Sequence, residues 1–401
     1  MDLRERNIEN NQSESKVKLA NILVFILLLL AVVGVSFFVY LNSIGIDIKD
    51  VSVQELIKTG LRPKEQKSVE RNIGDLKYDF KEHPVFVAYK EYLIRCMKDE
   101  VIYCNKEGNE VWSRNLQVNA PIVKTAGDYM LIAGKGAREI YVFKDRDIKW
   151  NKRVEGNIIN AEINEDGYVV VLHEATGYKG AVTVFNLQGN PFFTRNIAEG
   201  FLLGARVSPS GKQVVIGSVD ITGVQAGTNF EFTDILGKPI AQKKLMENTI
   251  LASMWYLNDE AAVAVSDSTV VCLDKLGNAK WKKEFGPGKI FSSGIALEKY
   301  IVLAVSDDEK SGLFQGNSSE VKILNQNGDQ SASFKLDSHI INVEVFSDTI
   351  AVNSGREVYF INTKGKLLGK YTSKADVLSV NFYNKQQAAI ITKSSVVSVD
   401  I

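Results

Sequence analysis

A short turn sequence returns through most of the chain and restricts its fold more than any other feature. In each copy an apolar run ends in Asn or Asp, two residues follow, then a Gly, and then a second extended run begins. The glycines of the six copies are Gly108, Gly189, Gly237, Gly277, Gly328 and Gly365. An Asn or Asp side chain at the first position caps its own backbone, and Gly accepts the left-handed conformation needed three residues later. Each copy therefore predicts a tight turn between two antiparallel strands.

A seventh copy, at residues 143–150, has Arg146 where the glycine is expected. With it, the turns recur on average every ~43 residues between Gly108 and Gly365, a period typical of four-stranded propeller blades. The segments between them are short β-branched and aromatic runs without a long helical period. The predicted fold is all-β: an eight-bladed β-propeller of four-stranded antiparallel blades. A seven-bladed ring and a β-helix are the alternatives.

The count of eight comes from the predicted inner strands. These strands are expected to begin near Pro84, Ala120, Ile158, Phe201, Ile250, Ile290, Ile340 and Val377. The last unit supplies three strands before the chain stops, and residues 76–80 precede the first inner strand. Pairing of the two ends would complete the eighth blade and close the ring, which leaves no long unpaired strand edge. The propeller is therefore predicted to span residues 76–401.

Four copies carry an aromatic residue four positions after the glycine or its replacement. These residues are Trp112, Trp150, Phe193 and Trp281, and all are predicted in the outermost strand of a blade. The set Cys272, Asp274, Gly277 and Trp281 resembles the quinoprotein-type (PQQ-like) propeller repeat, with Leu276 in place of its usual Thr. The resemblance covers about residues 76–401 and implies that these aromatics dock one blade onto the next.

The resemblance implies a fold more than an activity. Quinone-dependent enzymes with this repeat have adjacent cysteines against the quinone and an acidic calcium site. This chain has no Cys-Cys pair, so no cofactor and no metal are expected. The turn at residues 208–212 is similar to one in other propeller families, including WD40-like repeats. The overall layout also resembles an uncharacterised group of bacterial single-pass membrane proteins that carry a propeller outside the membrane.

A membrane anchor is predicted at residues 19–41, which contain no charged side chain. This length suits one helical crossing of a bilayer and exceeds the apolar region of a cleavable signal peptide. Basic residues before it are Arg4, Arg6, Lys16 and Lys18, whereas Lys49 is the one basic residue in the 15 positions after it. Because positive charge stays inside, residues 1–18 are expected in the cytoplasm and the propeller outside it.

A polar stalk is predicted between the anchor and the propeller, at residues 42–75. Within it, Ser52 and Glu55 fit a capping box, and Gly60 can end a short helix near residues 52–59. The sequence leaves open whether this helix lies on the membrane or docks beneath the domain.

The remaining composition excludes several classes of function. Lys plus Arg and Asp plus Glu number 48 each, so no basic excess indicates a nucleic-acid partner. Cys96 and Cys104 either form one disulfide across a hairpin or are two buried thiols. The histidines, His83, His173 and His339, are isolated in sequence and predicted to be structural or exposed. No catalytic residue is predicted.

Three predicted connections between second and third strands are long, at residues 173–179, 219–228 and 307–319. Equivalent connections emerge on the same face of a propeller, so these loops should gather on one rim. Insertions on one face of a repeat protein often form its binding surface, although solvated loops also grow at little cost. The candidate binding residues are Tyr178, Lys179, Asp220, Gln225, Asp308, Lys310 and Phe314.

The leading hypothesis is a non-catalytic binding or scaffold protein held in the cell membrane. Its expected partners are the lipid bilayer, through residues 19–41, and a protein or cell-envelope ligand on the rim face. The alternatives are a ligand sensor that acts through a membrane partner, and an enzyme with its site in the central channel.

Overall fold

The computed structural model describes residues 28–29, 31–32, 71–221, 224–241, 244–306 and 318–401. The chain divides into two compact units, Met1–Gln66 and Lys67–Ile401. The four described residues of the first unit are helical. The rest of the predicted anchor 19–41, the tail 1–18 and the helix near 52–59 lie outside the described residues. Among the residues described, no helix has the length and apolar character that a membrane crossing requires.

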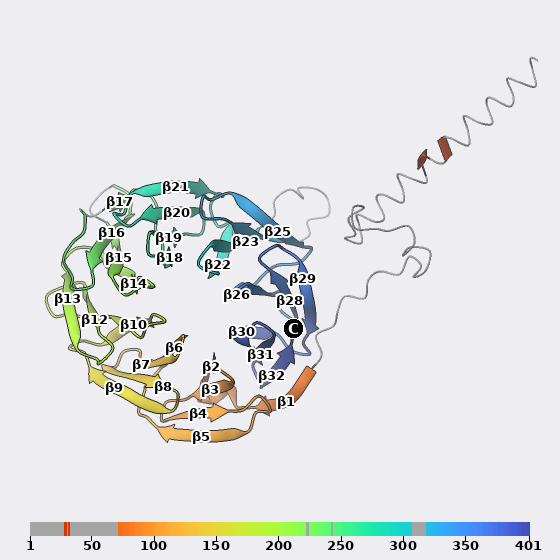
Figure 1. Cartoon of the computed structure of the whole chain (residues 1–401), viewed down its shortest axis with the longest axis horizontal. Coiled ribbons are helices and arrows are strands. Elements are labelled where there is room, and N and C mark those ends of the chain that lie inside the picture. The colour runs from red at the N-terminus through yellow and green to blue at the C-terminus, as the bar shows by residue number, and fades with distance from the viewer. Residues whose placement is uncertain (1–27, 30, 33–70, 222–223, 242–243, 307–317) are drawn as a thin grey trace, which may run out of the picture. The chain divides into compact units, whose positions relative to one another are not determined.

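The second unit is a closed ring of eight four-stranded antiparallel sheets (Figure 1). The predicted all-β, eight-bladed propeller is confirmed, and the seven-bladed and β-helical alternatives are wrong. We call the strands of each blade A to D from the channel outward. Strands A, B and C follow one another along the chain, and in blades 1–7 strand D comes next.

The strands of the first four blades follow the order A to D. Blade 1 comprises β2 (Val85–Tyr89), β3 (Tyr92–Cys96), β4 (Glu100–Cys104) and β5 (Glu110–Asn115). Blade 2 comprises β6 (Pro121–Ala126), β7 (Tyr129–Gly134), β8 (Glu139–Lys144) and β9 (Asp147–Arg153). Blade 3 comprises β10 (Ile158–Ile163), β11 (Val169–His173), β12 (Gly180–Phe185) and β13 (Pro191–Ile197). Blade 4 comprises β14 (Phe201–Val207), β15 (Gln213–Asp220), β16 (Gly227–Asp234) and β17 (Lys244–Met246).

The other four blades repeat this order. Blade 5 comprises β18 (Ser253–Asn258), β19 (Ala261–Val265), β20 (Thr269–Asp274) and β21 (Ala279–Glu284). Blade 6 comprises β22 (Ile290–Ala296), β23 (Tyr300–Ser306), β24 (Ser319–Leu324) and β25 (Gln330–Leu336). Blade 7 comprises β26 (Asn342–Phe346), β27 (Thr349–Asn353), β28 (Glu357–Asn362) and β29 (Leu367–Thr372). Blade 8 comprises β30 (Val377–Asn384), β31 (Gln387–Thr392), β32 (Ser395–Asp400) and β1 (Arg71–Lys77).

Blade 8 joins the two ends of the domain. Strand β1 pairs antiparallel with β32, with Leu76 opposite Val396. The sequence placed this strand at residues 76–80, about five residues too far along the chain. The reason for the difference is Asp79, whose side chain accepts a hydrogen bond from the Lys81 backbone and starts the short 3-10 helix η2 (Phe80–Glu82). The extended conformation therefore ends before Tyr78.

Packing between neighbouring blades supplies the core. Among the described residues, buried apolar side chains form eight clusters, one at each junction between consecutive blades. The B and C strands are covered on both faces, which is why β11 and β12 are buried at every position. Such strands read as short continuous apolar runs rather than as alternating ones. The outermost strands alternate less regularly and are largely exposed.

The turn glycines and the outer aromatics of adjacent blades meet. A Cβ atom placed on Gly189 of blade 3 would lie 2.6 Å from Cδ2 of Trp150 in β9 of blade 2. Phe193 lies in the same way against Gly237. Trp281 lies against Gly328, and its Nε1 donates a hydrogen bond to the carbonyl of the adjacent turn, 2.8 Å away. These glycines are thus required by close approach as well as by positive φ.

The remaining turn positions vary this arrangement. Trp112 lies in β5 and makes an edge contact with Tyr103, 4.8 Å between ring centroids. Gly108 faces Leu76 of the closing strand β1, whereas Gly277 faces Phe232. The aromatic contact is therefore one of several ways to cover the turn of the next blade.

The turn without a glycine differs from the predicted copy. Lys144 pairs directly with Asp147, so the loop contains two residues rather than the longer Asx-x-x-Gly form. Asp145 takes the left-handed conformation, with φ 58°, and not Arg146, which was expected to replace the glycine. Asp tolerates this region better than most residues because its short side chain can bond locally.

The cysteines do not form a disulfide. Cys96 and Cys104 are free and buried, as is Cys272. Cys96 pairs with Val101, and Cys104 pairs with Leu93. Cys96 packs at the junction of blades 1 and 2, and Cys104 at the junction of blades 8 and 1, so their side chains lie on opposite faces of one sheet. Of the two predicted alternatives, the buried thiols are the one observed.

Candidate functional site

The ring has two faces, and each carries its own kind of connection. Consecutive strands of a blade are antiparallel. The A–B and C–D turns therefore lie on one face, and the B–C and D–A connections lie on the other. We call the first the turn face, because it carries the Asx-x-x-Gly turns, and the second the loop face. The three long loops predicted from the sequence are B–C connections, so they emerge on the loop face.

The structure places four of the seven candidate residues on this face. Tyr178 and Lys179 precede β12 of blade 3, and Asp220 and Gln225 flank the loop between β15 and β16 of blade 4. Lys179 Nζ lies 5.5 Å from the ring centroid of Phe201 on the neighbouring blade. The other three candidates lie outside the described residues: Asp308, Lys310 and Phe314.

Asp220 and Gln225 line one small pocket. Its volume is about 320 Å³, and Val224 and Asn248 also contribute to its wall. Asp220 Oδ2 accepts a hydrogen bond of 2.8 Å from Asn229 Nδ2 on the paired strand. This pocket joins the loop of blade 4 to the D–A connection before blade 5.

Exposed apolar side chains gather beside this pocket. Val224 is fully exposed and Phe201 is 51% exposed. The same face carries further large exposed apolar residues over blades 3 to 5: Tyr178, Ile221 and Ile250. We call Tyr178, Lys179, Phe201, Asp220, Ile221, Val224, Asn248 and Ile250 the loop-face sector. Large exposed apolar side chains on one face of a protein are candidates for an interaction site.

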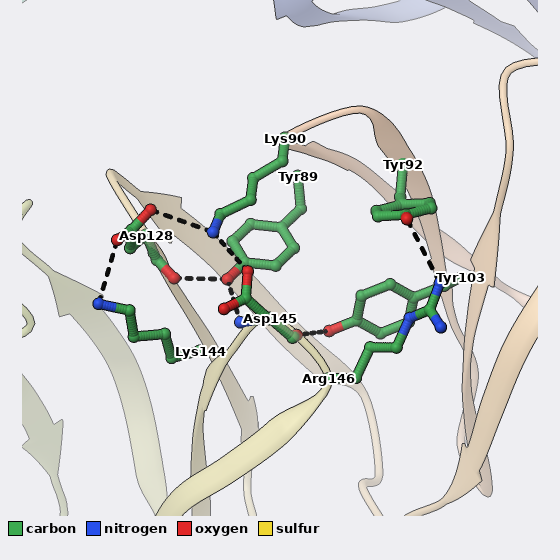
Figure 2. A network of polar contacts seen from close by, with 8 residues as sticks. All are labelled: Tyr89, Lys90, Tyr92, Tyr103, Asp128, Lys144, Asp145 and Arg146. Carbon is green, nitrogen blue, oxygen red and sulfur yellow. Dashed lines mark hydrogen bonds and ion pairs between the residues drawn. The ribbon is translucent and has the colours of Figure 1, made fainter.

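The turn face between blades 1 and 2 is instead held by internal charge pairing (Figure 2). Lys90 Nζ lies 3.0 Å from Asp128 Oδ1 and also bonds Asp145, while Lys144 Nζ lies 3.1 Å from Asp128 Oδ2. Hydrogen bonds from Lys90 and Lys144 hold the pKa of the Asp128 carboxyl below its ordinary value. The bond with Asp145, and a weaker one with Asp128, raise the pKa of Lys90 despite opposition from partial desolvation.

Tyrosines complete this network. The Asp145 backbone N–H donates to Tyr89 Oη at 2.8 Å, and Tyr103 Oη donates to the Asp145 carbonyl at 2.6 Å (Figure 2). Arg146 stacks over the Tyr92 ring, 5.3 Å from its centroid. Desolvation by burial raises the pKa of Tyr103. Because these groups satisfy one another, the network locks two blades together and offers little to a ligand.

The central channel carries a second set of charges. Glu162 Oε1 on β10 accepts Lys124 Nζ from β6 and Arg206 Nη2 from β14, each at 3.2 Å. Those bonds cross-link the inner strands of three blades. Glu344 lines a cavity of about 830 Å³ at the turn-face mouth and takes part in none of the ion pairs found among the described residues. Desolvation raises the pKa of Glu344, and the charge of Lys124 partly opposes this shift.

The histidines occupy separate places. His173 is buried, with its ring nitrogens 2.8 Å from Thr183 Oγ1 and from the Glu174 carbonyl. His83 caps η2 in the left-handed conformation, and the His339 ring lies 5.1 Å from Phe291. Over the described ranges, no three His, Cys, Asp or Glu side chains are grouped as a metal site would require.

Most residues of the loop-face sector were not predicted from the sequence. Phe201 and Ile250 were used only to predict where two inner strands begin. Their position gave no signal of exposure, because the residues that begin other inner strands, such as Ile158 and Ile290, are buried between blades. Asn248 carries no signal either, since its place depends on the D–A connection.

Solved structures share this fold at low sequence identity. The C-terminal WD40 domain of Sif2 matches with TM-score 0.60 and 13% identity, over 84% of this chain and 99% of that one. Sqt1 of Saccharomyces cerevisiae matches with TM-score 0.57 and 9% identity, over 84% and 99%. BamB from Moraxella catarrhalis matches with TM-score 0.51 and 12% identity, over 83% and 100%. These likenesses show a β-propeller repeat domain and nothing about activity.

Sequence comparison adds two findings. No curated protein matches the chain. A family model described as a family of unknown function, DUF5711, matches residues 66–401.

Proposed function

Because the chain belongs to the family of unknown function DUF5711, its role has to come from its own surface, and we propose that it is a non-catalytic binding protein. Residues 19–41 anchor it in the cell membrane with the N-terminus in the cytoplasm. The propeller lies outside the cytoplasm and contacts another protein of the envelope through the loop-face sector.

The exposed apolar sector on one face carries this proposal. Aromatic residues are enriched in protein interfaces, and charged residues are depleted at their centres. Phe201, Val224 and Ile250 present such a surface, while Lys179 and Asp220 stand at its edge. Phe201 is 51% exposed, so burial of the rest of its side chain would contribute about 1 kcal/mol to association. By contrast, the charges of the turn face near Asp128 are already paired within the ring.

The path of the chain agrees with this assignment. Strand β32 runs toward the turn face, and β1 is antiparallel to it, with Arg71 opposite Val399. Arg71 therefore lies at the turn-face end of β1. The C-terminal residue Ile401 follows β32 at the same face. The first and last described residues of the domain thus both lie at the turn face, away from the loop-face sector.

Site-specific photocrosslinking tests the contact. A benzoylphenylalanine residue is placed at Phe201 or Val224 in the full-length chain expressed in its native cells. Leu187 and Leu236, which are exposed in C–D turns of the turn face, are the matched control positions. We expect an adduct of one defined mass from the loop-face positions, and we expect Val224→Asp to abolish it. Equal adducts from both faces, or none from either, would contradict the proposal.

Cysteine labelling tests the location separately. A Val224→Cys variant of the full-length chain is treated in intact cells with a maleimide that does not cross membranes. The three native cysteines are buried, so they give little background. We expect labelling of the new thiol without lysis. Labelling that requires lysis would place the propeller in the cytoplasm and refute the proposed topology.

A further inference from the structure

A second pocket opens on the loop face between blades 5 and 6, and it shares Asn248 and Ile250 with the loop-face sector. Its volume is about 760 Å³, within the range of about 300–1,000 Å³ found for small-molecule sites. The D–A connection before β18, the B–C turn after β19 and the first residues of β22 form its walls. It lies at the loop-face mouth of the channel and is rigidly framed, because all three walls belong to the ring.

Hydroxyl groups dominate the polar lining of this pocket. They belong to Thr249, Ser253, Ser266, Ser268, Ser292 and Ser293. Some already serve the fold: Ser266 Oγ accepts the Thr269 backbone N–H at 2.9 Å, and Ser292 Oγ accepts that of Val343 at 3.0 Å. Within the part of the chain that the structure describes, the Ser253 and Ser293 hydroxyls make no hydrogen bond. A hydroxyl both donates and accepts, so these two groups remain able to pair with a ligand of either kind.

One aromatic ring, that of Trp255, contributes to the apolar part of the wall. Trp255 on β18 is partly buried, with its ring packed against the apolar cluster between blades 5 and 6. Phe291 on β22 also lines the pocket, but its ring packs toward blade 7, against the apolar cluster of blades 6 and 7 and the His339 ring. Ser253 and Trp255 are two positions apart on one strand and therefore face the same side. The pocket thus presents an indole beside a free hydroxyl.

The ionisable side chains around the pocket indicate which class of ligand it suits. Asp267 is the one ionisable side chain among its lining residues, and its Oδ2 accepts the Gly288 backbone N–H at 3.1 Å. No lining residue is cationic, so the site has nothing to pair with a phosphate or carboxylate group. A saccharide has alternating hydroxyl and C–H faces, which suit side-chain hydroxyls and an aromatic ring together.

We propose that this pocket, framed by Trp255, Phe291, Ser253 and Ser293, binds a neutral saccharide. The Trp255 ring lies against the C–H face of one sugar ring. The serine hydroxyls and Asp267 bond its hydroxyl groups. This site goes beyond the protein contact proposed for the loop-face sector. The variants below change pocket residues outside that sector, and the crosslinking positions Phe201 and Val224 lie outside the pocket, so either proposal can fail without the other.

Titration calorimetry tests the proposal on the full-length chain in phosphatidylcholine nanodiscs, which avoid detergents with sugar head groups. The probes are maltotriose, cellotriose and tri-N-acetylchitotriose, with trigalacturonic acid as the anionic comparison. We expect saturable binding of at least one neutral trisaccharide with a Kd between about 10 μM and 1 mM. Absence of binding by all three neutral probes at millimolar concentration, or a preference for the anionic probe, would overturn the proposal.

Variants locate the binding. Ser253→Val with Ser293→Val removes two hydroxyls that the fold does not use, and should weaken binding about tenfold or more. Trp255→Leu should weaken it at least as much, and far-UV circular dichroism checks that this variant is folded. Ser113→Val, in the outermost strand of blade 1, is the matched control and should leave the Kd unchanged. Binding that survives the double variant, or that the Ser113 control weakens equally, would place the site elsewhere.

Discussion

Two glycines with the same backbone conformation separate the effect of φ from the effect of blade contact. Gly136 and Gly189 both have φ +75°. A Cβ atom at Gly136 would meet no heavy atom within 4 Å, whereas one at Gly189 would lie 2.6 Å from Trp150 Cδ2. Replacing each with Ala therefore adds the same methyl group in the same conformation, with a different neighbour.

The two variants are expected to lose different amounts of stability, and the difference is the cost of moving Trp150. For a residue with a Cβ, the left-handed conformation costs about 1–2 kcal/mol, and reduced entropy of the unfolded chain returns about 0.4–1 kcal/mol. Gly136→Ala should therefore lower the free energy of unfolding by about 1 kcal/mol. Trp150 is 7% exposed and packs against Phe185, with 5.7 Å between ring centroids, so it has little room to shift. Overpacking of this kind costs a further ~1–3 kcal/mol in Gly189→Ala.

Urea unfolding of the full-length protein in nanodiscs, followed by circular dichroism and by tryptophan fluorescence, measures both variants. A difference of about 2 kcal/mol corresponds to a roughly 30-fold change in the unfolding equilibrium. The same pair of variants is then made in a Trp150→Ala background, where the obstructing ring is absent. There Gly189→Ala should cost no more than Gly136→Ala. Two outcomes would refute docking of one blade on the turn of the next. One is an equal loss of stability in the two variants when Trp150 is present. The other is a larger loss in Gly189→Ala that stays the same when Trp150 is absent.

Three further predictions concern the turns, the thiols and the closing strand. Burial alone would raise the pKa of the Asp274 carboxyl, but hydrogen bonds from Asn278 and Leu276 outweigh this effect. The pKa of Asp274 therefore lies below its ordinary value of 3.8. Its stabilising contribution is therefore complete above pH 3.8 and lost as pH falls through the lowered pKa. The urea midpoint of unfolding should fall between pH 7 and pH 3, in part because Asp274 loses its charge. Asp274→Asn copies the Asn of four other turns and should remove this part of the fall. A fall of unchanged size in the variant would argue against the prediction. Burial raises the pKa of the Cys96 thiol to about 12 and that of Cys272 to about 11, so none of the three cysteines should react with a disulfide reagent at pH 8 until urea unfolds the domain. A chain begun at residue 79 lacks β1 and with it the side chains of Leu76 and Tyr78, which should cost about 4 kcal/mol and cause aggregation on size-exclusion chromatography. A chain begun at residue 67 is the control and should stay monodisperse.

The all-β propeller was predictable from local sequence because each blade repeats one local requirement. An Asx side chain and a left-handed residue three positions later define a turn within a few residues, whatever surrounds it. The seventh turn was misjudged for the same reason. Its two-residue loop places Asp145 in the left-handed conformation, and a pattern based on spacing to a glycine cannot find it.

The candidate surface was predictable only in part. Long B–C loops identify the face, since strand order alone decides where they emerge. The sequence does not show that Lys179 meets Phe201, or that Asp220 and Asn248 line one pocket, because these contacts join different blades. The pocket between blades 5 and 6 had no sequence signal, since isolated serines and one Trp carry none until three separate segments are brought together.

Strand positions, turn chemistry and the number of blades follow from the sequence itself, because a residue and its near neighbours decide a backbone conformation. Ring closure brings together side chains far apart along the chain, and this decided the rest. It sets Trp150 against Gly189 and pairs Asp128 with two lysines. Contacts between blades depend on the twist and tilt of whole sheets, which no short stretch of residues encodes.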